Sequence, residues 1–291
     1  MPFRPIDFHE PASLDEAVAL LASAGARCLA GGASLVPLMT AGTVRPERLV
    51  SLRRIPGLDA VTVGADGTVT IGAMATHARV AACDLIGGGN AAVREAAGQI
   101  AHPAIRTMGT MGGVLAFAEP SADYPCAVMA ADATVLVRGP AGSRTISADG
   151  FFVGAMATVL QPGEVVEALA LPPTRPGEAG AYLKFSRVDG DFATACVAVR
   201  LAVADGTVTA VRVAVGGCAP VPFRVPAAER ALVGSPPTDA AAVDRLGAAY
   251  AEAADPPSDF RGSADFRRMI LPGLIGRAVA RAAAKLAGAD R

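Results

Sequence analysis

The hydrophobic pattern of about the first 55 residues alternates between helical and extended spacing. Ser13-Leu-Asp-Glu16 is a capping box, the signature of a helix N-terminus. The apolar positions after it keep helical spacing over residues 14–23 and stop at Gly25, which predicts one helix. A strand at residues 27–30 and a helical turn at residues 36–40 are expected next. This part of the chain therefore resembles a small α/β unit.

The pattern then changes to strand-like runs separated by turns. Two pairs of runs flank an Ala-Asp-Gly and a Gly-Pro turn, which predicts two β-hairpins. A single helix lies between the hairpins, and one more strand follows them. The expected strands are residues 60–63, 68–71, 134–138, 144–146 and 165–171, and the expected helix is residues 91–100.

The C-terminal part begins after a Pro- and Gly-rich stretch, residues 172–180, which is the best candidate for a linker. Strands come first and helices last, which predicts an α+β arrangement with an antiparallel sheet and a helical bundle. The expected strands are residues 193–203 and 207–215, and the expected helices are residues 227–232, 240–253 and 263–286. Pro272 should kink or break the last helix.

Length and composition set the broad class. A chain of 291 residues suits two domains, which we place at residues 1–175, with subdomains of about 1–55 and 56–175, and at residues 180–288. Hydrophobic residues make up 52% of the chain, so a sizeable interior is expected. The formal net charge of −1 argues against a nucleic-acid partner. No apolar run is long enough for a transmembrane segment and the N-terminus is acidic, so a cytoplasmic location is expected.

The five cysteines are far apart and show no CxxC spacing, so neither a disulfide framework nor a local metal site is predicted. Two glycine pairs are better candidates for a binding site. Gly31-Gly32 lies where a strand turns into a helix, and Gly112-Gly113 ends the run that begins at Arg106. Backbone N–H groups can converge on an anion at such loops, and Ser34 and Thr110 add hydroxyl groups.

The two glycine loops lack the lysine and the spacing of a P-loop, so a nucleoside triphosphate with magnesium is a poor candidate for the ligand. Two neutral loops suit the pyrophosphate of a dinucleotide. From the glycines alone, two ordinary tight turns remain an open alternative.

Longer segments resemble the flavoprotein subunits of the molybdenum hydroxylases, the group that includes carbon monoxide dehydrogenase and the bacterial xanthine dehydrogenase type. Six segments are similar, in the same order, over roughly residues 3–285. They are Ala30-Gly-Gly-Ala-Ser-Leu35, Thr70-Ile-Gly-Ala73, Ile100 to Gly113, Glu119-Pro-Ser-Ala-Asp123, Tyr182-Leu-Lys-Phe-Ser-Arg187 and Ser263-Ala-Asp-Phe-Arg-Arg268.

The resemblance implies a vanillyl-alcohol-oxidase-type FAD-binding domain followed by a C-terminal flavoprotein domain. It implies that Asp123 is an acidic ligand on the ribityl or adenosine side, that Lys184 lies near the polar edge of the flavin, and that Val166 contacts the adenine. The pyrophosphate and ribityl contacts would fall on Leu29, Ala30, Gly31, Gly32, Ala33, Ser34 and Leu35, and on Thr110, Met111, Gly112, Gly113 and Val114. Ala33, Val114 and Glu119 depart from the family pattern. Ala33 and Val114 each remove a polar side chain but keep the backbone N–H, so the phosphate contacts are expected to survive with fewer side-chain contacts to FAD.

By the same resemblance, the chain is an oxidoreductase subunit that holds one FAD non-covalently and has no catalytic side chain of its own. Its partners would be an iron–sulfur subunit with [2Fe-2S] clusters and a subunit with the molybdenum cofactor, in a dimer of heterotrimers. Electrons would pass through the FAD to NAD, a quinone or oxygen. Two alternatives stay open: a self-contained flavin oxidoreductase of the same fold, and a non-catalytic scaffold.

Overall fold

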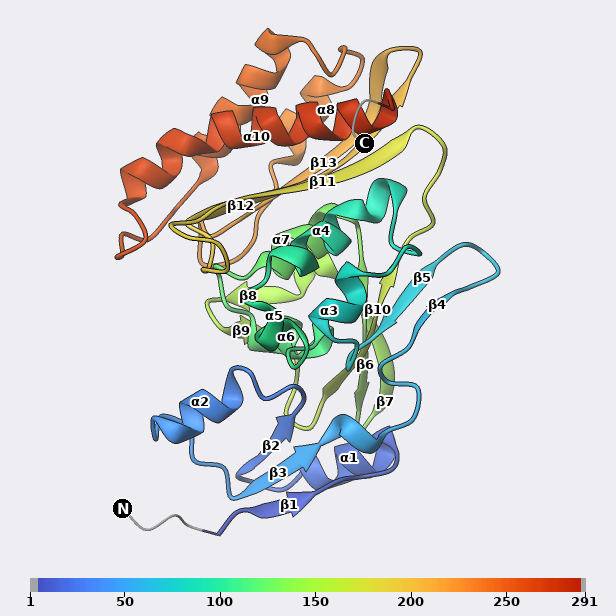
Figure 1. The fold of residues 1–291 in the computed structure, drawn as a ribbon, viewed down its shortest axis with the longest axis vertical. Helices are drawn as coiled ribbons and strands as arrows, with labels where there is room; N and C mark the ends of the chain where they lie inside the picture. The colour runs from blue at the N-terminus through green and yellow to red at the C-terminus, as the bar shows by residue number, and fades with distance from the viewer. Residues whose placement is uncertain (1–4, 289–291) are drawn as a thin grey trace.

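The computed structural model describes residues 5–288. In Figure 1 the elements are stacked in three levels along the long axis, with the N-terminal unit at the bottom and the C-terminal helices at the top. Within the described residues, no helix is both long enough and apolar enough to cross a membrane.

The lowest level is a small parallel sheet with two helices. Its strands follow the order β1-β3-β2, with β3 paired in parallel to both neighbours. The Ser13 hydroxyl caps α1 by accepting a hydrogen bond from the Glu16 N–H at 3.2 Å, and the Glu16 carboxylate accepts one from the N–H of Ala12, one residue before the cap, at 2.9 Å. The predicted helix ends two residues earlier than expected, and β1 and β3 were not predicted. The elements are β1 (Asp7–His9), α1 (Leu14–Leu21), β2 (Ala26–Leu29), α2 (Leu35–Thr40) and β3 (Arg48–Ser51).

The middle level is a five-stranded sheet in the order β4-β5-β10-β6-β7, in which every neighbouring pair is antiparallel. Both predicted hairpins are confirmed, β4 with β5 and β6 with β7. The strands are β4 (Val61–Val63), β5 (Val69–Gly72), β6 (Thr134–Gly139), β7 (Gly142–Ser147) and β10 (Val165–Leu171). A short two-stranded sheet, β8 (Phe152–Gly154) with β9 (Ala157–Thr158), lies beside it.

Five helices accompany this sheet, and the sequence pattern predicted only one of them well. The expected helix at residues 91–100 is confirmed as α4, but the apolar stretch before it contains only the short α3. The helices are α3 (His77–Ala81), α4 (Ala91–Gln99), α5 (Pro103–Arg106), α6 (Met111–Phe117) and α7 (Asp123–Ala130). All eight residues of α7 are buried, so this helix has no amphipathic pattern to reveal it.

The upper level is an antiparallel sheet with helices on both faces. The C-terminal helices cover one face, and α4 and α7 pack against the other (Figure 1). The predicted α+β class is therefore confirmed. The strands are β11 (Glu178–Phe185), β12 (Ala195–Ala204) and β13 (Thr207–Gly216), and the helices are α8 (Pro226–Leu232), α9 (Ala240–Ala253) and α10 (Ala264–Leu286).

Two expectations for this level hold only in part. Residues 172–177 connect β10 to β11, but β11 begins at Glu178, inside the expected linker. The last helix is not broken at Pro272, which lies inside α10. A Cβ on Gly247 of α9 would lie 2.7 Å from the Cα of Pro272, so the two helices pack very closely at this point. Tertiary packing therefore outweighs the cost of a proline in the helix interior.

Candidate functional site

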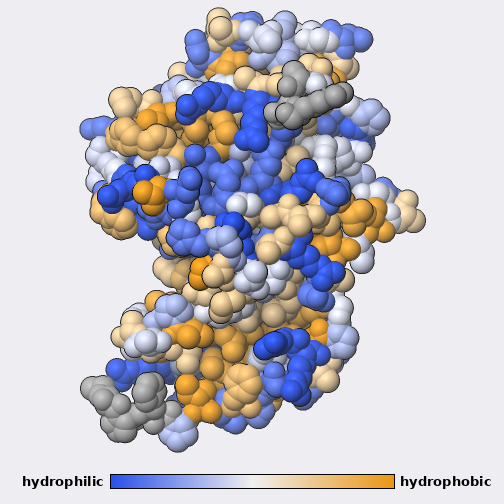
Figure 2. All heavy atoms as spheres, in the orientation of Figure 1, coloured by the Kyte–Doolittle hydropathy of each residue, from blue (hydrophilic) through white to orange (hydrophobic). Residues whose placement is uncertain are grey.

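A cavity of about 720 Å³ lies between the lower and middle levels of the fold, within the range typical of small-molecule and cofactor sites. In Figure 2 the molecular surface narrows between these two levels, and hydrophobic residues are visible at the narrowing. Most of the site residues expected from the sequence line this cavity: Ala30, Gly31, Gly32, Ala33, Ser34, Leu35, Thr110, Gly112, Gly113, Val114, Asp123 and Val166.

The first glycine loop connects β2 to α2 and is pressed against the second loop. A Cβ on Gly31 would lie 1.9 Å from the carbonyl oxygen of Met108, so only glycine fits there. Gly32 has φ +77°, in the left-handed region that favours glycine. The N–H groups of residues 31–34 donate to no acceptor within residues 5–288. This loop therefore presents free backbone donors beside the cavity.

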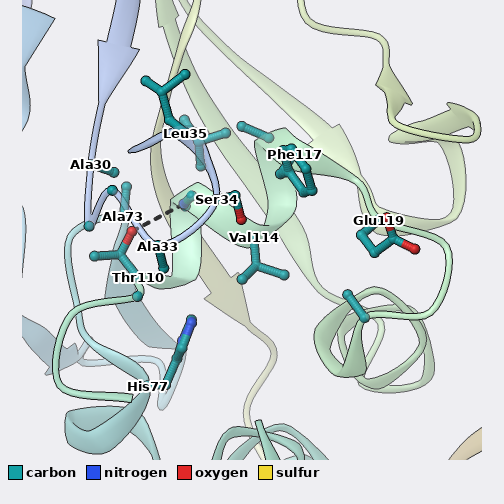
Figure 3. A pocket seen from close by; sticks show the side chains of 18 of the residues that line it. Ala30, Ala33, Ser34, Leu35, Ala73, His77, Thr110, Val114, Phe117 and Glu119 are labelled. Atoms are coloured by element: carbon teal, nitrogen blue, oxygen red, sulfur yellow. Dashed lines mark hydrogen bonds between the residues drawn. The ribbon is translucent and has the colours of Figure 1, made fainter. Parts of the chain in front are cut away.

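Ser34 stands at the N-cap position of α2, yet its hydroxyl makes no capping hydrogen bond. Figure 3 shows Ser34 near the second loop, in the wall of the pocket. A hydroxyl at an N-cap without a backbone partner is free to bind a ligand oxygen.

The second glycine loop behaves differently from the first. The N–H groups of Met111 and Gly112 donate to the carbonyl oxygens of Ala75 and Ala73, at 2.9 and 2.8 Å. The N–H of Gly113 donates to the Thr110 hydroxyl at 3.2 Å (Figure 3). The expectation that these N–H groups face a phosphate is therefore wrong, because each already has a partner in the protein.

Glycine at position 112 has a packing role instead. A Cβ there would lie 2.5 Å from the Cβ of Ala73 and 3.0 Å from its Cα. The close approach brings α6 against the end of β5 and so fixes the wall of the cavity. At this loop, the groups left to bind a ligand are the Thr110 N–H, which has no acceptor within residues 5–288, the Thr110 hydroxyl and neighbouring side chains.

Asp123 is a buried carboxylate of the cavity wall, and the side chains of Tyr182 and Lys184 hold it in place. The Tyr182 hydroxyl donates to Asp123 Oδ1 at 2.6 Å, and Lys184 Nζ lies 2.9 Å from the same oxygen. Oδ2 accepts no hydrogen bond from another residue of the described chain, and it is the oxygen left for a ligand. Burial raises the pKa of the Asp123 carboxyl, and Lys184 and Tyr182 oppose that shift.

Lys184 itself lies behind the wall. Its ammonium group also donates to the carbonyl oxygens of Gln99 at 2.7 Å and Asp191 at 3.1 Å, and its side chain is only 4% exposed. Lys184 thus joins the middle and upper levels of the fold and holds Asp123 in place. Lys184 is not among the residues that line the cavity, so it reaches the site only through Asp123.

Of the remaining expected residues, Val166 lines the cavity, whereas Leu29 and Met111 do not. Val166 is buried in β10 and lines the cavity. Leu29 precedes the first loop without lining the cavity, and Met111 is fully buried in the core. Sequence reasoning named none of these further lining residues as site residues, although the first three lie in a segment that resembles the family: Ile100, Ala101, Ile105, Phe117, Met156, Leu160, Glu164, Asp191 and Phe192. Within residues 5–288, no cluster of His, Cys, Asp or Glu could hold a metal ion.

These features fit a long dinucleotide with a pyrophosphate. N–H groups without a protein acceptor and the Ser34 hydroxyl lie beside one part of the cavity, the Asp123 carboxylate lines another part and can accept a hydrogen bond, and apolar side chains such as Val166 line the rest. FAD has a matching group for each: a pyrophosphate for the N–H groups, hydroxyls for the carboxylate and an adenine for the apolar side chains.

Ser34→Ala is expected to weaken FAD binding only moderately. It removes one hydroxyl among several donors, a loss of about 0.5–1.5 kcal/mol, or about two- to tenfold in Kd. Fluorescence titration of the apoprotein with FAD measures this change. A loss of more than about 100-fold would mean that the hydroxyl, and not the backbone, carries the binding at this loop.

Comparison with known proteins also indicates an FAD-binding protein. Residues 3–174 match the family model of the FAD-binding domain in molybdopterin dehydrogenase, and residues 180–282 match that of the CO dehydrogenase flavoprotein C-terminal domain. The chain is 36% identical to the carbon monoxide dehydrogenase medium chain of Hydrogenophaga pseudoflava over 283 residues, which are 97% of this chain and 98% of that one. It is also 36% identical to the nicotine 6-hydroxylase medium subunit of Paenarthrobacter nicotinovorans, over 96% of this chain and 98% of that one.

Solved structures agree with the sequence matches. A chain of the Hydrogenophaga pseudoflava carbon monoxide dehydrogenase superposes with a TM-score of 0.93 at 36% identity, covering 98% of this chain and 99% of that one. A chain of quinoline 2-oxidoreductase from Pseudomonas putida 86 superposes with a TM-score of 0.89 at 31% identity, covering both chains fully. The chain therefore belongs to the family of FAD-binding medium subunits of the molybdenum hydroxylases.

Proposed function

We propose that the protein binds one FAD non-covalently and serves as the electron-transfer subunit of a multi-subunit molybdenum hydroxylase. The single observation that carries this proposal is the first glycine loop, whose N–H groups at residues 31–34 have no protein acceptor and lie beside the large cavity. The FAD, when bound, supplies the redox chemistry, and the chain supplies binding and orientation.

Each site residue then has a proposed role. The backbone of Gly31 to Ser34, with the Ser34 hydroxyl, binds the pyrophosphate. Asp123 accepts a hydrogen bond from a cofactor hydroxyl through Oδ2, and Lys184 positions that carboxylate. Val166 packs against the adenine. Ala33 and Val114 contribute no polar side chain, so the free N–H groups of the first loop are the main pyrophosphate ligands.

The proposed partners are an iron–sulfur subunit, which delivers electrons, and a molybdenum-cofactor subunit, which oxidises the substrate, in a dimer of heterotrimers located in the cytoplasm. Relatives named as medium chains and medium subunits support an assembly of several chains. The proposed domains are residues 1–175, which bind FAD, and residues 180–288, the C-terminal flavoprotein domain. The three main sheets support this division, because β10 and β11 belong to different sheets on either side of it.

Flavin analysis and turnover assays of the purified chain test this function. Acid release should give FAD, not FMN, at about one per chain, because the cavity is built for a pyrophosphate. Dithionite should reduce this FAD. The isolated chain should oxidise no purine, aldehyde, aromatic heterocycle or carbon monoxide, because insertion of oxygen from water needs a metal centre that residues 5–288 do not provide.

These assays distinguish an electron-transfer subunit from a self-contained flavoenzyme and from a non-catalytic scaffold. Adding the two partner subunits should restore substrate-driven bleaching of the flavin. Robust substrate oxidation by the isolated chain would instead identify a self-contained flavoenzyme. A preparation that takes up no flavin even after reconstitution would identify a scaffold.

A further inference from the structure

His77 is a buried side chain of the cavity that the proposed binding scheme does not use. It begins α3, its backbone N–H donates to the carbonyl oxygen of Gly109 at 3.0 Å, and the residue is 2% exposed. Figure 3 shows the ring directed toward the second loop, below Thr110. A Cβ on Gly109 would lie 2.5 Å from His77 Nε2, so this nitrogen lies directly against the second loop.

The two ring nitrogens have different surroundings. Nδ1 is fully buried and has no hydrogen-bond partner within the described residues. Nε2 also makes no hydrogen bond there, but it is not enclosed, and His77 lines the cavity. A neutral imidazole carries its proton on one nitrogen only. An unpaired buried N–H is rarer in proteins than an under-satisfied acceptor, so the proton belongs on Nε2, facing the cavity.

Charge supports the neutral form of this ring. Burial, together with the guanidinium of Arg106 on α5, lowers the pKa of His77 to about 4. The ring packs edge-on against Tyr124 of α7, with centroids 5.3 Å apart, and Tyr124 brings no negative charge because burial raises its own pKa. Above pH 5 the side chain is therefore an uncharged donor.

The second loop explains why such a donor is needed. Its N–H groups at residues 111–113 already bind Ala75, Ala73 and Thr110. Among the described residues, a cofactor that crosses this loop finds one backbone donor without an acceptor, the N–H of Thr110, and two side-chain donors, the Thr110 hydroxyl and His77 Nε2.

We propose that His77, as the neutral Nε2–H tautomer, donates a hydrogen bond to an oxygen of the ribityl–pyrophosphate segment of FAD. This proposal rests on the proposed function and adds a cofactor-positioning residue from outside both glycine loops. In this arrangement the first loop binds the cofactor through the N–H groups of residues 31–34 and the Ser34 hydroxyl, and the second loop region binds it through Thr110 and His77.

FAD titration of three apoprotein variants tests the proposal. His77→Phe keeps a ring but removes the donor, and it should raise the Kd about 10- to 100-fold, the effect of losing a hydrogen bond to a charged oxygen. His77→Gln keeps an N–H of similar reach and should recover most of the affinity. Tyr124→Phe, the matched control, removes an unpartnered buried hydroxyl behind the ring and should leave the Kd unchanged. Thermal unfolding of each apoprotein shows whether the variants fold.

Two further measurements do not depend on the variants. The chain has only three histidines, so ¹⁵N-histidine NMR can resolve the His77 ring, which should show a protonated Nε2 and an unprotonated Nδ1. The wild-type Kd should stay constant between about pH 5.5 and 8, whereas a cationic His77 would lose affinity as pH rises through about 6.5. An unchanged Kd in folded His77→Phe, or a proton on Nδ1, overturns the proposal. Wild-type protein that binds no FAD overturns the proposed function itself.

Discussion

Gly31→Ala is expected to abolish FAD retention. The added Cβ would lie 1.9 Å from the Met108 carbonyl oxygen and 2.9 Å from the Cα of Gly109, and both are backbone atoms of the second loop. Backbone cannot swing aside as a flexible side chain can, so the two loops must move apart. Loss of two charge-assisted hydrogen bonds to the pyrophosphate amounts to about 3–6 kcal/mol, at least about 100-fold in Kd.

The measurement is flavin content after gel filtration, followed by FAD titration of the apoprotein. Gly150→Ala is the matched control, because a Cβ at that exposed glycine meets nothing within 4 Å. It should retain FAD as the wild type does. Full flavin in Gly31→Ala would mean that the first loop does not bind the pyrophosphate.

Gly32→Val should also lose FAD, for a different reason. The residue has φ +77°, and a β-branched side chain in the left-handed region is strained even where space allows it. Gly112→Val is a poorer probe of FAD binding, because its side chain would collide with Ala73 and disturb the packing of α6. The two glycine pairs thus look alike in sequence but act differently.

The sequence pattern predicted the elements that pack one face against the core, such as α1, α9 and both hairpins. It did not predict α6 or α7, because the residues of α7 are buried on every side and those of α6 include a glycine pair. Helical periodicity carries no information where there is no exposed face. The strand β1 has only three residues, DFH, too few for an alternating pattern.

The glycine pairs, together with the family resemblance, indicated the two loops, and most of the residues expected there line the cavity. The hydrogen bonds of the second loop could not be predicted, since they depend on Ala73 and Ala75, which have no chemical signature. Arg267 gives another example: an arginine on a long helix usually faces solvent, yet Arg267 is completely buried and its guanidinium donates to the carbonyl oxygens of Thr194 and Gly217. Whether such groups are buried, and which partners they bind, depends on contacts between residues that lie far apart in the sequence.

Lys184→Met is expected to destabilise the folded protein by about 3–5 kcal/mol at neutral pH, the usual effect of removing one partner of a buried ion pair. The side chains of Lys184 and Asp123 are 4% and 5% exposed, so solvent cannot replace the lost cation. Asp123 would keep only the Tyr182 hydroxyl as a donor to Oδ1. Arg187→Met, at an exposed position on the same segment, is the matched control and should change the unfolding free energy by less than about 0.5 kcal/mol.

The pH dependence of this effect has a definite sign. The pKa of Asp123 is already raised above 3.8 by burial in the wild type, and removing the ammonium group raises it further. A carboxyl whose pKa is higher in the folded state than in the unfolded state favours folding only while it is protonated. The stability that it contributes is lost as pH rises from 3.8, the pKa of the unfolded state, through the pKa of the folded state. The deficit of Lys184→Met should therefore be largest at neutral pH and should shrink in acid.

Denaturant unfolding at several pH values, compared with the wild type, measures this dependence. The double variant Asp123→Asn/Lys184→Met provides the internal check, because a neutral amide at position 123 needs no cation. It should be less destabilised than the sum of the two single variants, and its deficit should not depend on pH in this range. The double variant should bind FAD more weakly than the wild type, because a neutral amide replaces the carboxylate that lines the cavity. Additive losses, or a Lys184→Met deficit that is independent of pH, would show that Lys184 stabilises the fold through the carbonyl groups of Gln99 and Asp191 and not through Asp123.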